Sequence, residues 1–210
     1  MKDKKIMILV TMHRQLKELP LFLEFLKRCN LDYKPDICVY TNNLEDSKDV
    51  YCEILRSYSD NFKITLYKDS ENTGYTLGLY TGLEKCRYIY DKYDFVIHTH
   101  ADVFLTDYNK IIKELEKNES DIYVANECNK QYMTDFFVFN PQKIRFENYN
   151  SLQGVAEEIL YQICERDKVK IVKLPRYNQG EFYPGFRQID RMGIWHEHNI
   201  AAVINYLNNS

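Results

Sequence analysis

The chain has 210 residues, of which 45% are hydrophobic and 28% are charged, and its formal net charge is −3 at pH 7. This size and composition suit one folded domain, so we expect residues 1–210 to form a single domain with a sizeable core. The slight acidic excess and the scattered lysines and arginines exclude nucleic acid as a partner. No apolar run approaches the roughly 20 residues of a membrane span.

The cysteines and the N-terminal run indicate the compartment. The six cysteines are widely spaced and include no C-x-x-C pair, which is typical of reduced, packed thiols. The apolar run 6–11 is too short for a signal peptide and lacks a small-residue cleavage site. We therefore expect a cytoplasmic protein in which this run is the first strand.

Strand and helix patterns alternate through the first half of the chain. Short β-rich runs predict strands over 5–11, 36–41, 62–67 and 94–99. Helical spacing predicts helices over 19–29 and 46–58, and a third helix that carries Leu79, Leu83 and Cys86 on one face. This alternation predicts a mostly parallel, doubly wound α/β sheet with right-handed crossovers.

The second half is more mixed. Thr106 is a candidate N-cap for a helix with Ile111, Ile112 and Leu115 in one stripe, and a further helical stripe extends from Leu152 to Ile163. Further strands are predicted over 121–125, 135–140 and 170–174. Residues 175–193 show no periodicity and precede a short terminal helix. A loop of this length in a compact domain is usually functional or mobile.

The end of the fourth predicted strand carries three side chains that can bind a metal ion. His98, His100 and Asp102 are spaced two residues apart, so an extended backbone points them to one side. Open α/β sheets bind ligands beyond the carboxyl ends of their strands, where His100 and Asp102 are expected. The competing interpretation is a capping aspartate with a buried histidine, and we favour a structural role for His98, which lies deeper in the strand.

Two more histidines, His196 and His198, lie near the C-terminus. Either could complete a metal site with His100 and Asp102, because folds commonly gather site residues from distant parts of a chain. Taken alone, the pair is typical of a surface helix. Carboxylate and imidazole ligands suit a divalent cation, which would leave positions open for a diphosphate and neutralise its charge.

The segment from Asn72 to Gly82 contains three of the seven glycines of the chain. Glycine permits close backbone approach and unusual torsions. The segment therefore predicts either a phosphate site at a helix N-terminus or close packing of that helix on the sheet, and the two alternatives are equally open.

Three carboxylates are candidates for a general base that takes a proton from a hydroxyl group. Asp135 adjoins an apolar strand and is harder to interpret as a surface residue. Glu157 and Glu158 lie off the apolar stripe of their helix, where a solvated face is the default for at least one of them. Asp135 and Glu158 rank nearly equal.

The order of these motifs resembles the GT-A fold of nucleotide-sugar-dependent glycosyltransferases, above all the small inverting enzymes with a family 2-like layout, over nearly the whole chain. The end of the first strand, at Thr11, His13 and Arg14, is similar to the family's nucleotide pocket. Asn42, at the end of the second strand, stands where the family often carries an aspartate near the base.

Later motifs follow the same order. Asn72-Thr73-Gly74 is similar to an Asn-x-Gly segment that leads into a helix. His100-Ala101-Asp102 is similar to the D-x-D motif that holds the metal and nucleotide, with histidine in place of the first aspartate. His196 or His198 resembles the later histidine that some of these enzymes recruit to the metal. Glu157-Glu158 is similar to the family's acidic pair ahead of a helix.

This resemblance implies a Rossmann-like α/β domain with a nucleotide-binding half at about 1–105 and an acceptor or catalytic half at about 106–210. It implies a UDP- or GDP-activated sugar, Mn²⁺ or Mg²⁺, and transfer to a hydroxyl of a glycan or glycoconjugate acceptor. We expect inversion, with Asp135 or Glu158 as the base. Arg187 or Arg191, in the loop before the C-terminal segment, would fold over the donor.

Two other functions remain open. His98-x-His100-x-Asp102 also resembles the H-x-H-x-D motif of metallo-β-lactamase-like hydrolases, although Val103 stands where that motif continues with histidine. A non-catalytic sugar-binding module with a degenerate metal site is the third possibility. The sequence gives no prediction of the oligomeric state.

Overall fold

The computed structural model describes residues 4–29, 31, 33–125, 130–176 and 189–209. Its centre is a seven-stranded sheet with the strand order β3-β2-β1-β4-β7-β6-β8. The strands of this sheet are β1 (Ile6–Met12), β2 (Asp36–Thr41), β3 (Ile64–Lys68), β4 (Phe95–His100), β6 (Ile122–Val124), β7 (Phe136–Phe139) and β8 (Ile171–Lys173).

The first four strands of the sheet are parallel, and the later ones are mixed. β1 pairs in parallel with β2 and β4, and β2 pairs in parallel with β3. β7 is antiparallel to both β4 and β6, whereas β8 is parallel to β6. The mostly parallel α/β sheet with a mixed C-terminal half is therefore confirmed.

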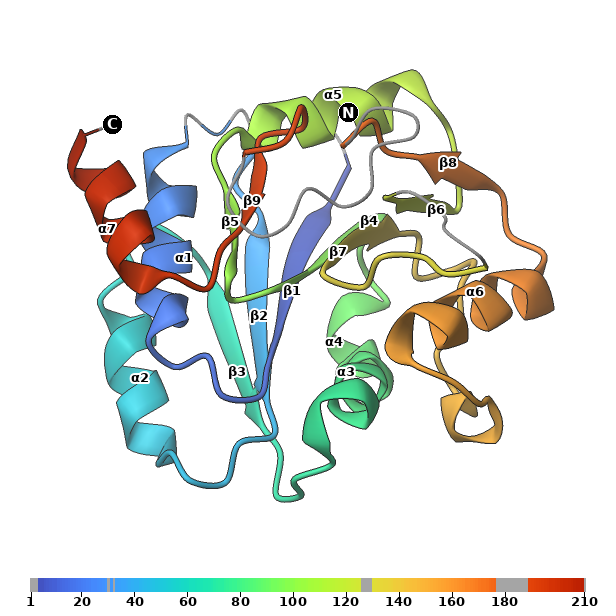
Figure 1. Ribbon diagram of the computed structural model, residues 1–210, viewed down its shortest axis with the longest axis horizontal. Helices are drawn as coiled ribbons and strands as arrows, with labels where there is room; N and C mark the ends of the chain where they lie inside the picture. Colours follow the sequence, from blue (N-terminus) through green and yellow to red (C-terminus); the bar gives the residue numbers. More distant parts are fainter. Residues whose placement is uncertain (1–3, 30, 32, 126–129, 177–188, 210) are drawn as a thin grey trace.

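Helices cover both faces of the sheet (Figure 1). The structure contains α1 (Glu18–Arg28), α2 (Lys48–Arg56), α3 (Gly74–Lys85), α4 (Arg87–Tyr90), α5 (Tyr108–Lys117), α6 (Ala156–Asp167) and α7 (Ile200–Asn209), with a 3₁₀ turn at Tyr149–Ser151. Buried side chains of α1, α2, α5 and α7 form one core cluster, and those of α3, α4 and α6 form the other. None of the described helices is long and apolar enough to cross a bilayer.

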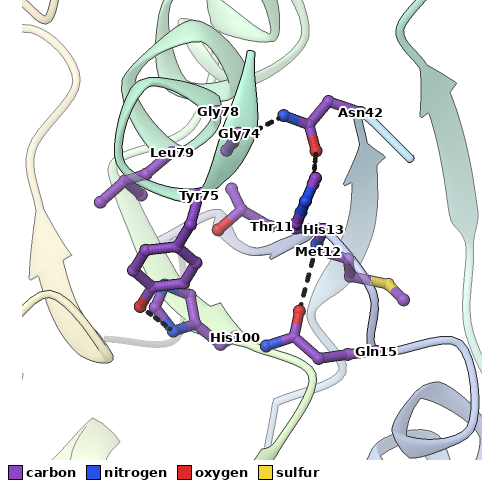
Figure 2. A pocket seen from close by; sticks show the side chains of 10 residues that line it. All are labelled: Thr11, Met12, His13, Gln15, Asn42, Gly74, Tyr75, Gly78, Leu79 and His100. Atoms are coloured by element: carbon purple, nitrogen blue, oxygen red, sulfur yellow. Dashed lines mark hydrogen bonds between the residues drawn. The ribbon is translucent and has the colours of Figure 1, made fainter. Parts of the chain in front are cut away.

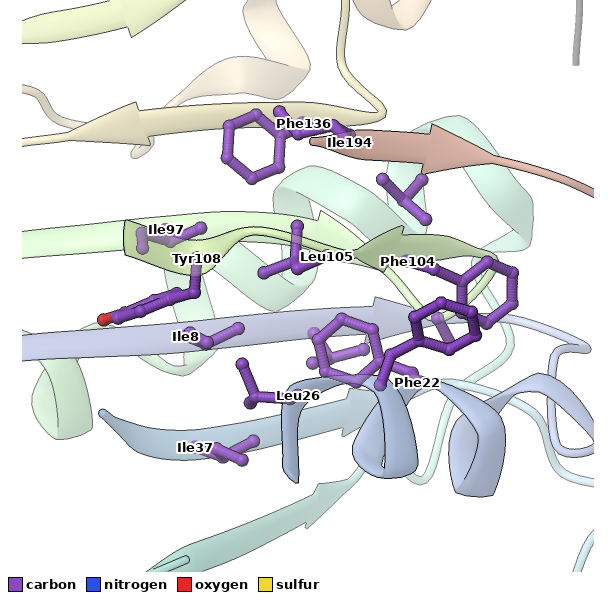
Figure 3. Packing of buried hydrophobic residues seen from close by; sticks show 14 of the residues in the cluster. Ile8, Phe22, Leu26, Ile37, Ile97, Phe104, Leu105, Tyr108, Phe136 and Ile194 are labelled. Carbon is purple, nitrogen blue, oxygen red and sulfur yellow. The ribbon is translucent and has the colours of Figure 1, made fainter. Parts of the chain in front are cut away.

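The two cores follow from the alternation of side chains along the strands. In β1, Ile8 and Val10 face the α1 side, whereas Met7 and Leu9 face the α3 side. Phe22 and Leu26 of α1 pack among the strand residues of the first core (Figure 3). Complete burial of each such side chain contributes about 1.5–3 kcal/mol. The continuous apolar run of β1 is therefore explained by burial on both faces.

A second, two-stranded sheet was not predicted. β5 (Val103–Leu105) pairs antiparallel with β9 (Ile194–His196), so that Val103 lies opposite His196. This pairing returns the C-terminal segment to the end of β4 (Figure 1). It places His196 beside Asp102, which follows β4.

Two predicted helix starts were wrong. Asp107, not Thr106, caps α5, because its side chain accepts a hydrogen bond from the Lys110 amide. The Thr106 hydroxyl instead donates to the carbonyl of Gly193, at the turn before β9. The stripe predicted from Leu152 begins before its helix, since α6 starts at Ala156.

Candidate functional site

The ends of β1, β2 and β4 meet the N-terminus of α3 at a small pocket. The register of β1 with β4 places Thr11 opposite His100. The residues that line this pocket are Thr11, Met12, His13, Gln15, Asn42, Gly74, Tyr75, Gly78, Leu79 and His100 (Figure 2). Five of the residues predicted to bind the nucleotide or metal therefore lie together: Thr11, His13, Asn42, Gly74 and His100.

Asn42 joins the two sides of this pocket. Its Oδ1 lies 2.8 Å from Nδ1 of His13, and its Nδ2 donates to the carbonyl of Gly74 at 2.9 Å (Figure 2). A Cβ on Gly78 would lie 2.3 Å from that Nδ2 atom, so the glycine is required by the close approach of Asn42. Gly74 has φ of +73° and begins the helix. The close-packing alternative is therefore confirmed at Gly78, whereas a phosphate site at the start of this helix stays a prediction.

His98 is the buried histidine that we expected inside the strand. Its side chain is completely buried, and Nε2 lies 2.8 Å from the hydroxyl of Thr11. The ring packs on Phe137 with a centroid distance of 4.5 Å. Burial lowers the pKa of His98 well below its ordinary value. This histidine is therefore neutral, and its hydrogen bond to Thr11 links β4 to β1.

His100 lines the pocket and contacts Tyr75. Its Nδ1 lies 3.2 Å from the Tyr75 hydroxyl, and the two rings meet edge to face (Figure 2). Burial also lowers the pKa of His100, so its imidazole is neutral. Nε2 is buried and has no hydrogen-bond partner among the described residues. A buried polar atom of this kind is costly unless a ligand or water satisfies it.

Asp102, His196 and His198 form a group that can hold a metal ion. One ligand atom from each residue lies within 4.8 Å of the others, and this group does not include His100. The Asp102 Oδ2 atom lies 3.7 Å from His196 Nε2 and 3.0 Å from His198 Nδ1. The Glu197 amide also donates to the Asp102 carbonyl at 3.1 Å, which fixes the two segments together.

The donor set fits a divalent transition metal. The Oδ1 atom of Asp102 is buried without a partner among the described residues, although its carboxylate is ionised. One carboxylate and two imidazoles suit Mn²⁺ better than Mg²⁺, which prefers oxygen ligands. The side chain of His198 is 55% exposed, so the site opens to solvent on one side. The residues present therefore fit a metal that keeps coordination positions for another ligand.

His196 lies between two carboxylates. Its Nδ1 atom is 3.4 Å from Oδ2 of Asp135, on the opposite side of the ring from Asp102. Burial lowers the pKa of His196, but both carboxylates favour its protonated form and raise the pKa to about 9. Metal binding would displace the proton on Nε2, since only a neutral imidazole is a ligand.

The three candidate base residues have different surroundings. Asp135 is buried, which disfavours its charge, yet Arg176 and His196 hold its pKa far below the usual range. Glu158 accepts the Val155 amide at 3.2 Å, which caps the start of α6. Glu157 accepts a hydrogen bond from the hydroxyl of Thr134 at 3.1 Å.

Nearby carboxylates shift the pKa values of two pocket residues, Tyr75 and His100. Burial is the largest cause that raises the pKa of Tyr75, and the charges of Asp102, Glu157 and Asp135 raise it further. The same Glu157 charge opposes the effect of burial on the pKa of His100. In the fold, the Glu157 carboxylate is held by Thr134, which precedes Asp135 in the chain.

The remaining predicted site residues do not line the pocket. Arg14 is exposed and lies 3.8 Å from Glu45. Asn72 is exposed, and its side chain accepts the Gly74 amide at 3.0 Å. The Ala101 side chain packs in the core on the α1 side.

Of the two loop arginines, Arg191 is exposed, and its amide donates to the carbonyl of Arg176. Arg187 lies outside the described residues.

Sequence reasoning did not identify Tyr75, Gln15, Arg176 or Asp190 as site residues. Tyr75 follows the glycine that begins α3, and this position was the available signal. Arg176 and Asp190 belong to the aperiodic segment 175–193, where charged residues are usually solvated. Arg176 is instead one of the largest fully buried side chains of the described structure.

Comparison with solved structures gives the fold. A mannosyltransferase, PcManGT from Pyrobaculum calidifontis in complex with GDP-Man and Mn²⁺, matches with a TM-score of 0.59 and 11% identity, covering 82% of this chain and 55% of that one. TarS 1-349 of S. aureus in complex with UDP matches with a TM-score of 0.57 and 11% identity, covering 81% and 57%. An active-site mutant of LgtC matches with a TM-score of 0.62 and 13% identity, covering 92% and 88%.

This chain therefore spans just over half the length of the PcManGT and TarS chains that it matches. Neither a family model nor a curated protein sequence matches it. The strand order, the flanking helices and these structural matches agree with one another. The chain has the GT-A fold of nucleotide-sugar glycosyltransferases.

Proposed function

We propose that the chain is a metal-dependent glycosyltransferase that moves a sugar from a UDP- or GDP-sugar to a hydroxyl of a glycan acceptor. The carrying observation is the group of Asp102, His196 and His198, which follows β4 at the same end of the sheet as the pocket. Ligands in open α/β sheets bind at this end. PcManGT, which has the same fold, was solved with GDP-Man and Mn²⁺.

The donor half would comprise about residues 1–105 and the acceptor half about 106–210. In the donor half, His13 and Asn42 form the wall that receives the nucleotide, and Gly74 allows its approach. His100 offers its unpartnered Nε2 to a polar group of the donor. Since its imidazole is neutral, this contact is a hydrogen bond and not an ion pair.

Asp102, His196 and His198 would hold Mn²⁺, and Mg²⁺ is the weaker candidate for this donor set. When bound, the cation supplies charge neutralisation for the departing nucleoside diphosphate. The exposed side of His198 leaves that diphosphate a path to the site. Arg191 is proposed to contact the donor from the rim.

We propose Glu157 as the base that takes the proton from the acceptor hydroxyl in an inverting transfer. Its hydrogen bond from Thr134 fixes the carboxylate, and the next residue, Asp135, accepts the amide of the pocket residue His100. Asp135 is a poor proton acceptor because its pKa is so low. Glu158 is engaged in capping α6.

The hydrolase alternative lacks support from the geometry. His98 is engaged with Thr11 inside the sheet, and the metal-capable group among the described residues joins Asp102 to the C-terminal histidines instead. We propose the cytoplasm as the location because the cysteines of the described residues are free thiols.

The test is thermal stabilisation by UDP, GDP and other nucleoside diphosphates, with and without Mn²⁺. The cognate nucleotide with Mn²⁺ should raise the Tm by about 5–10 °C at 100 times its Kd. Asp102→Asn should abolish the Mn²⁺-dependent part, whereas Asp36→Asn, at the amino end of β2, should retain it.

A panel of sugar nucleotides then tests transfer by release of the nucleoside diphosphate. Release that requires Mn²⁺ and an acceptor supports the enzyme. Nucleotide binding without release from any donor would instead indicate a sugar-binding module. Stabilisation that is identical with and without metal would contradict the proposed metal site.

A further inference from the structure

Arg176 is a completely buried cation that joins two buried carboxylates. Its Nη1 donates to both carboxylate oxygens of Asp135, at 3.0 and 3.2 Å, and its Nη2 donates to Oδ2 at 3.2 Å. Its Nε donates to Oδ2 of Asp190 at 2.5 Å. A guanidinium has five donors in a planar fork, so both carboxylates are held in fixed orientations.

The Asp135 carboxylate also reaches the metal-binding group. Its Oδ2 atom is 3.4 Å from His196 Nδ1, while Nε2 of the same ring is 3.7 Å from Asp102. The main chain of Asp135 is anchored too, because its carbonyl accepts the His100 amide at 3.3 Å. Asp135 is therefore fixed on the protein side of His196, away from Asp102.

Asp190, the second carboxylate that Arg176 holds, fixes the turn that precedes β9, the strand that carries His196. The Oδ1 atom of Asp190 accepts the amides of Met192 and Ile194 at 2.8 and 3.0 Å, which shapes the turn before β9. Gly193 in this turn has φ of +74°, and its carbonyl accepts the Thr106 amide and hydroxyl. One arginine thus links the start of β7 to the start of β9.

We propose that Asp135 and Arg176 position His196 as a metal ligand, an inference that rests on the proposed metal-dependent function. Asp135 accepts the Nδ1–H of His196, which selects the tautomer with a free Nε2 and aims that atom at the site shared with Asp102. Arg176 prevents the carboxylate from turning away. Partners of this kind on ligand histidines raise metal affinity and fix ring orientation.

The competing explanation is that the ion pairs only stabilise the fold. Buried ion pairs are weak evidence for stability, because apolar side chains of similar volume often do as well. A purely structural pair would lower the Tm when broken and leave metal affinity unchanged in the folded protein. A positioning pair would change metal affinity beyond what the loss of stability explains.

The experiment measures Mn²⁺ affinity by electron paramagnetic resonance titration of the free ion, together with the Tm of each variant. Asp135→Ala should weaken Mn²⁺ binding about 10- to 100-fold, the usual cost of removing such a partner. Asp135→Asn keeps one acceptor oxygen and should fall between wild type and Asp135→Ala. Arg176→Lys keeps the charge but not the fork, and it should also weaken binding.

Asp69→Asn is the matched control. Asp69 is a buried carboxylate held by Lys85 and Tyr40, on the β3–α3 side of the sheet and outside the metal-capable group. It should lower the Tm and leave Mn²⁺ affinity at the wild-type value. A comparable loss of affinity in this control would assign the effect to general destabilisation and overturn the proposal.

The outcomes separate the two levels of inference. Mn²⁺ binding by wild type that is lost in Asp102→Ala would support the metal site. Wild-type Mn²⁺ affinity in folded Asp135→Ala would then overturn only the positioning role of Asp135. If Asp135→Ala does not fold, Asp135→Asn decides, because unchanged affinity there overturns the role. Absence of Mn²⁺ binding by wild type would overturn the metal-dependent function and this inference with it.

Discussion

His13 donates from Nδ1 to Oδ1 of Asn42 across 2.8 Å, and this contact joins the ends of β1 and β2 at the wall of the pocket. The other end of the Asn42 amide donates to the carbonyl of Gly74 at 2.9 Å. One amide therefore holds two strands and the N-terminus of α3 in a fixed relation. Only a side chain with an acceptor and a donor can do both.

Replacing Asn42 with aspartate should open this wall. The variant keeps the acceptor for His13, but its second oxygen faces the Gly74 carbonyl, so two acceptors are brought together. We expect a loss of about 1–3 kcal/mol in the free energy of unfolding. Nucleoside diphosphate affinity should fall as well, measured by calorimetric titration. Wild-type affinity in Asn42→Asp would contradict the assignment of this wall to the nucleotide.

Gly78→Ala should disturb the same wall from the helix side. The new Cβ would lie 2.3 Å from Asn42 Nδ2, so either α3 or the amide must move. We expect about 1–3 kcal/mol of destabilisation by overpacking, together with weaker nucleotide binding. Gly82→Ala is the control one turn later, because its Cβ meets the Tyr40 ring at 2.6 Å instead. It should destabilise the fold without changing nucleotide affinity in the folded protein.

Glu157→Gln should separate catalysis from binding. Removing a general base typically lowers kcat about 10²- to 10⁴-fold, and the amide can still accept from Thr134. Binding of the nucleotide with Mn²⁺ should therefore stay near the wild-type level. Steady-state rates and thermal shifts measured on the same preparation check both expectations.

The neighbouring variant is the comparison. Glu158→Gln keeps an acceptor for the Val155 amide at the start of α6, so we expect near-normal stability and near-normal kcat. A larger loss of kcat in Glu158→Gln than in Glu157→Gln would exchange the two roles.

Asp69 should contribute to the acid sensitivity of the fold. Burial raises the pKa of Asp69, but hydrogen bonds from Lys85 and Tyr40 outweigh it and hold the pKa below the ordinary value of 3.8. A carboxylate with a depressed folded pKa stabilises the protein above its unfolded pKa, and this contribution is lost as the pH falls through the folded pKa. Denaturation of wild type and Asp69→Asn should therefore differ most near neutral pH and converge in acid. A difference that is constant from neutral pH into acid would contradict this assignment.

The sequence by itself determined the layout of the first half. The apolar runs of β1, β2 and β4 are confined between polar breaks, and both faces of these three strands are buried, so local composition specifies them without reference to the partners. Their alternation with helices specifies the parallel order. The clustering of Thr11, Asn42 and His100 follows, because the carboxyl ends of parallel strands meet at one edge of the sheet.

Only the tertiary structure decided which charged groups meet. The pairing of β5 with β9 joins residues far apart in the chain and leaves no local periodicity, yet it sets Asp102 beside His196. In the same way, Arg176 turns Asp135 from a candidate base into a fixed partner of His196. The strength and role of a buried charge depend on its neighbours and on the exclusion of water, and neither is encoded by the residue type alone.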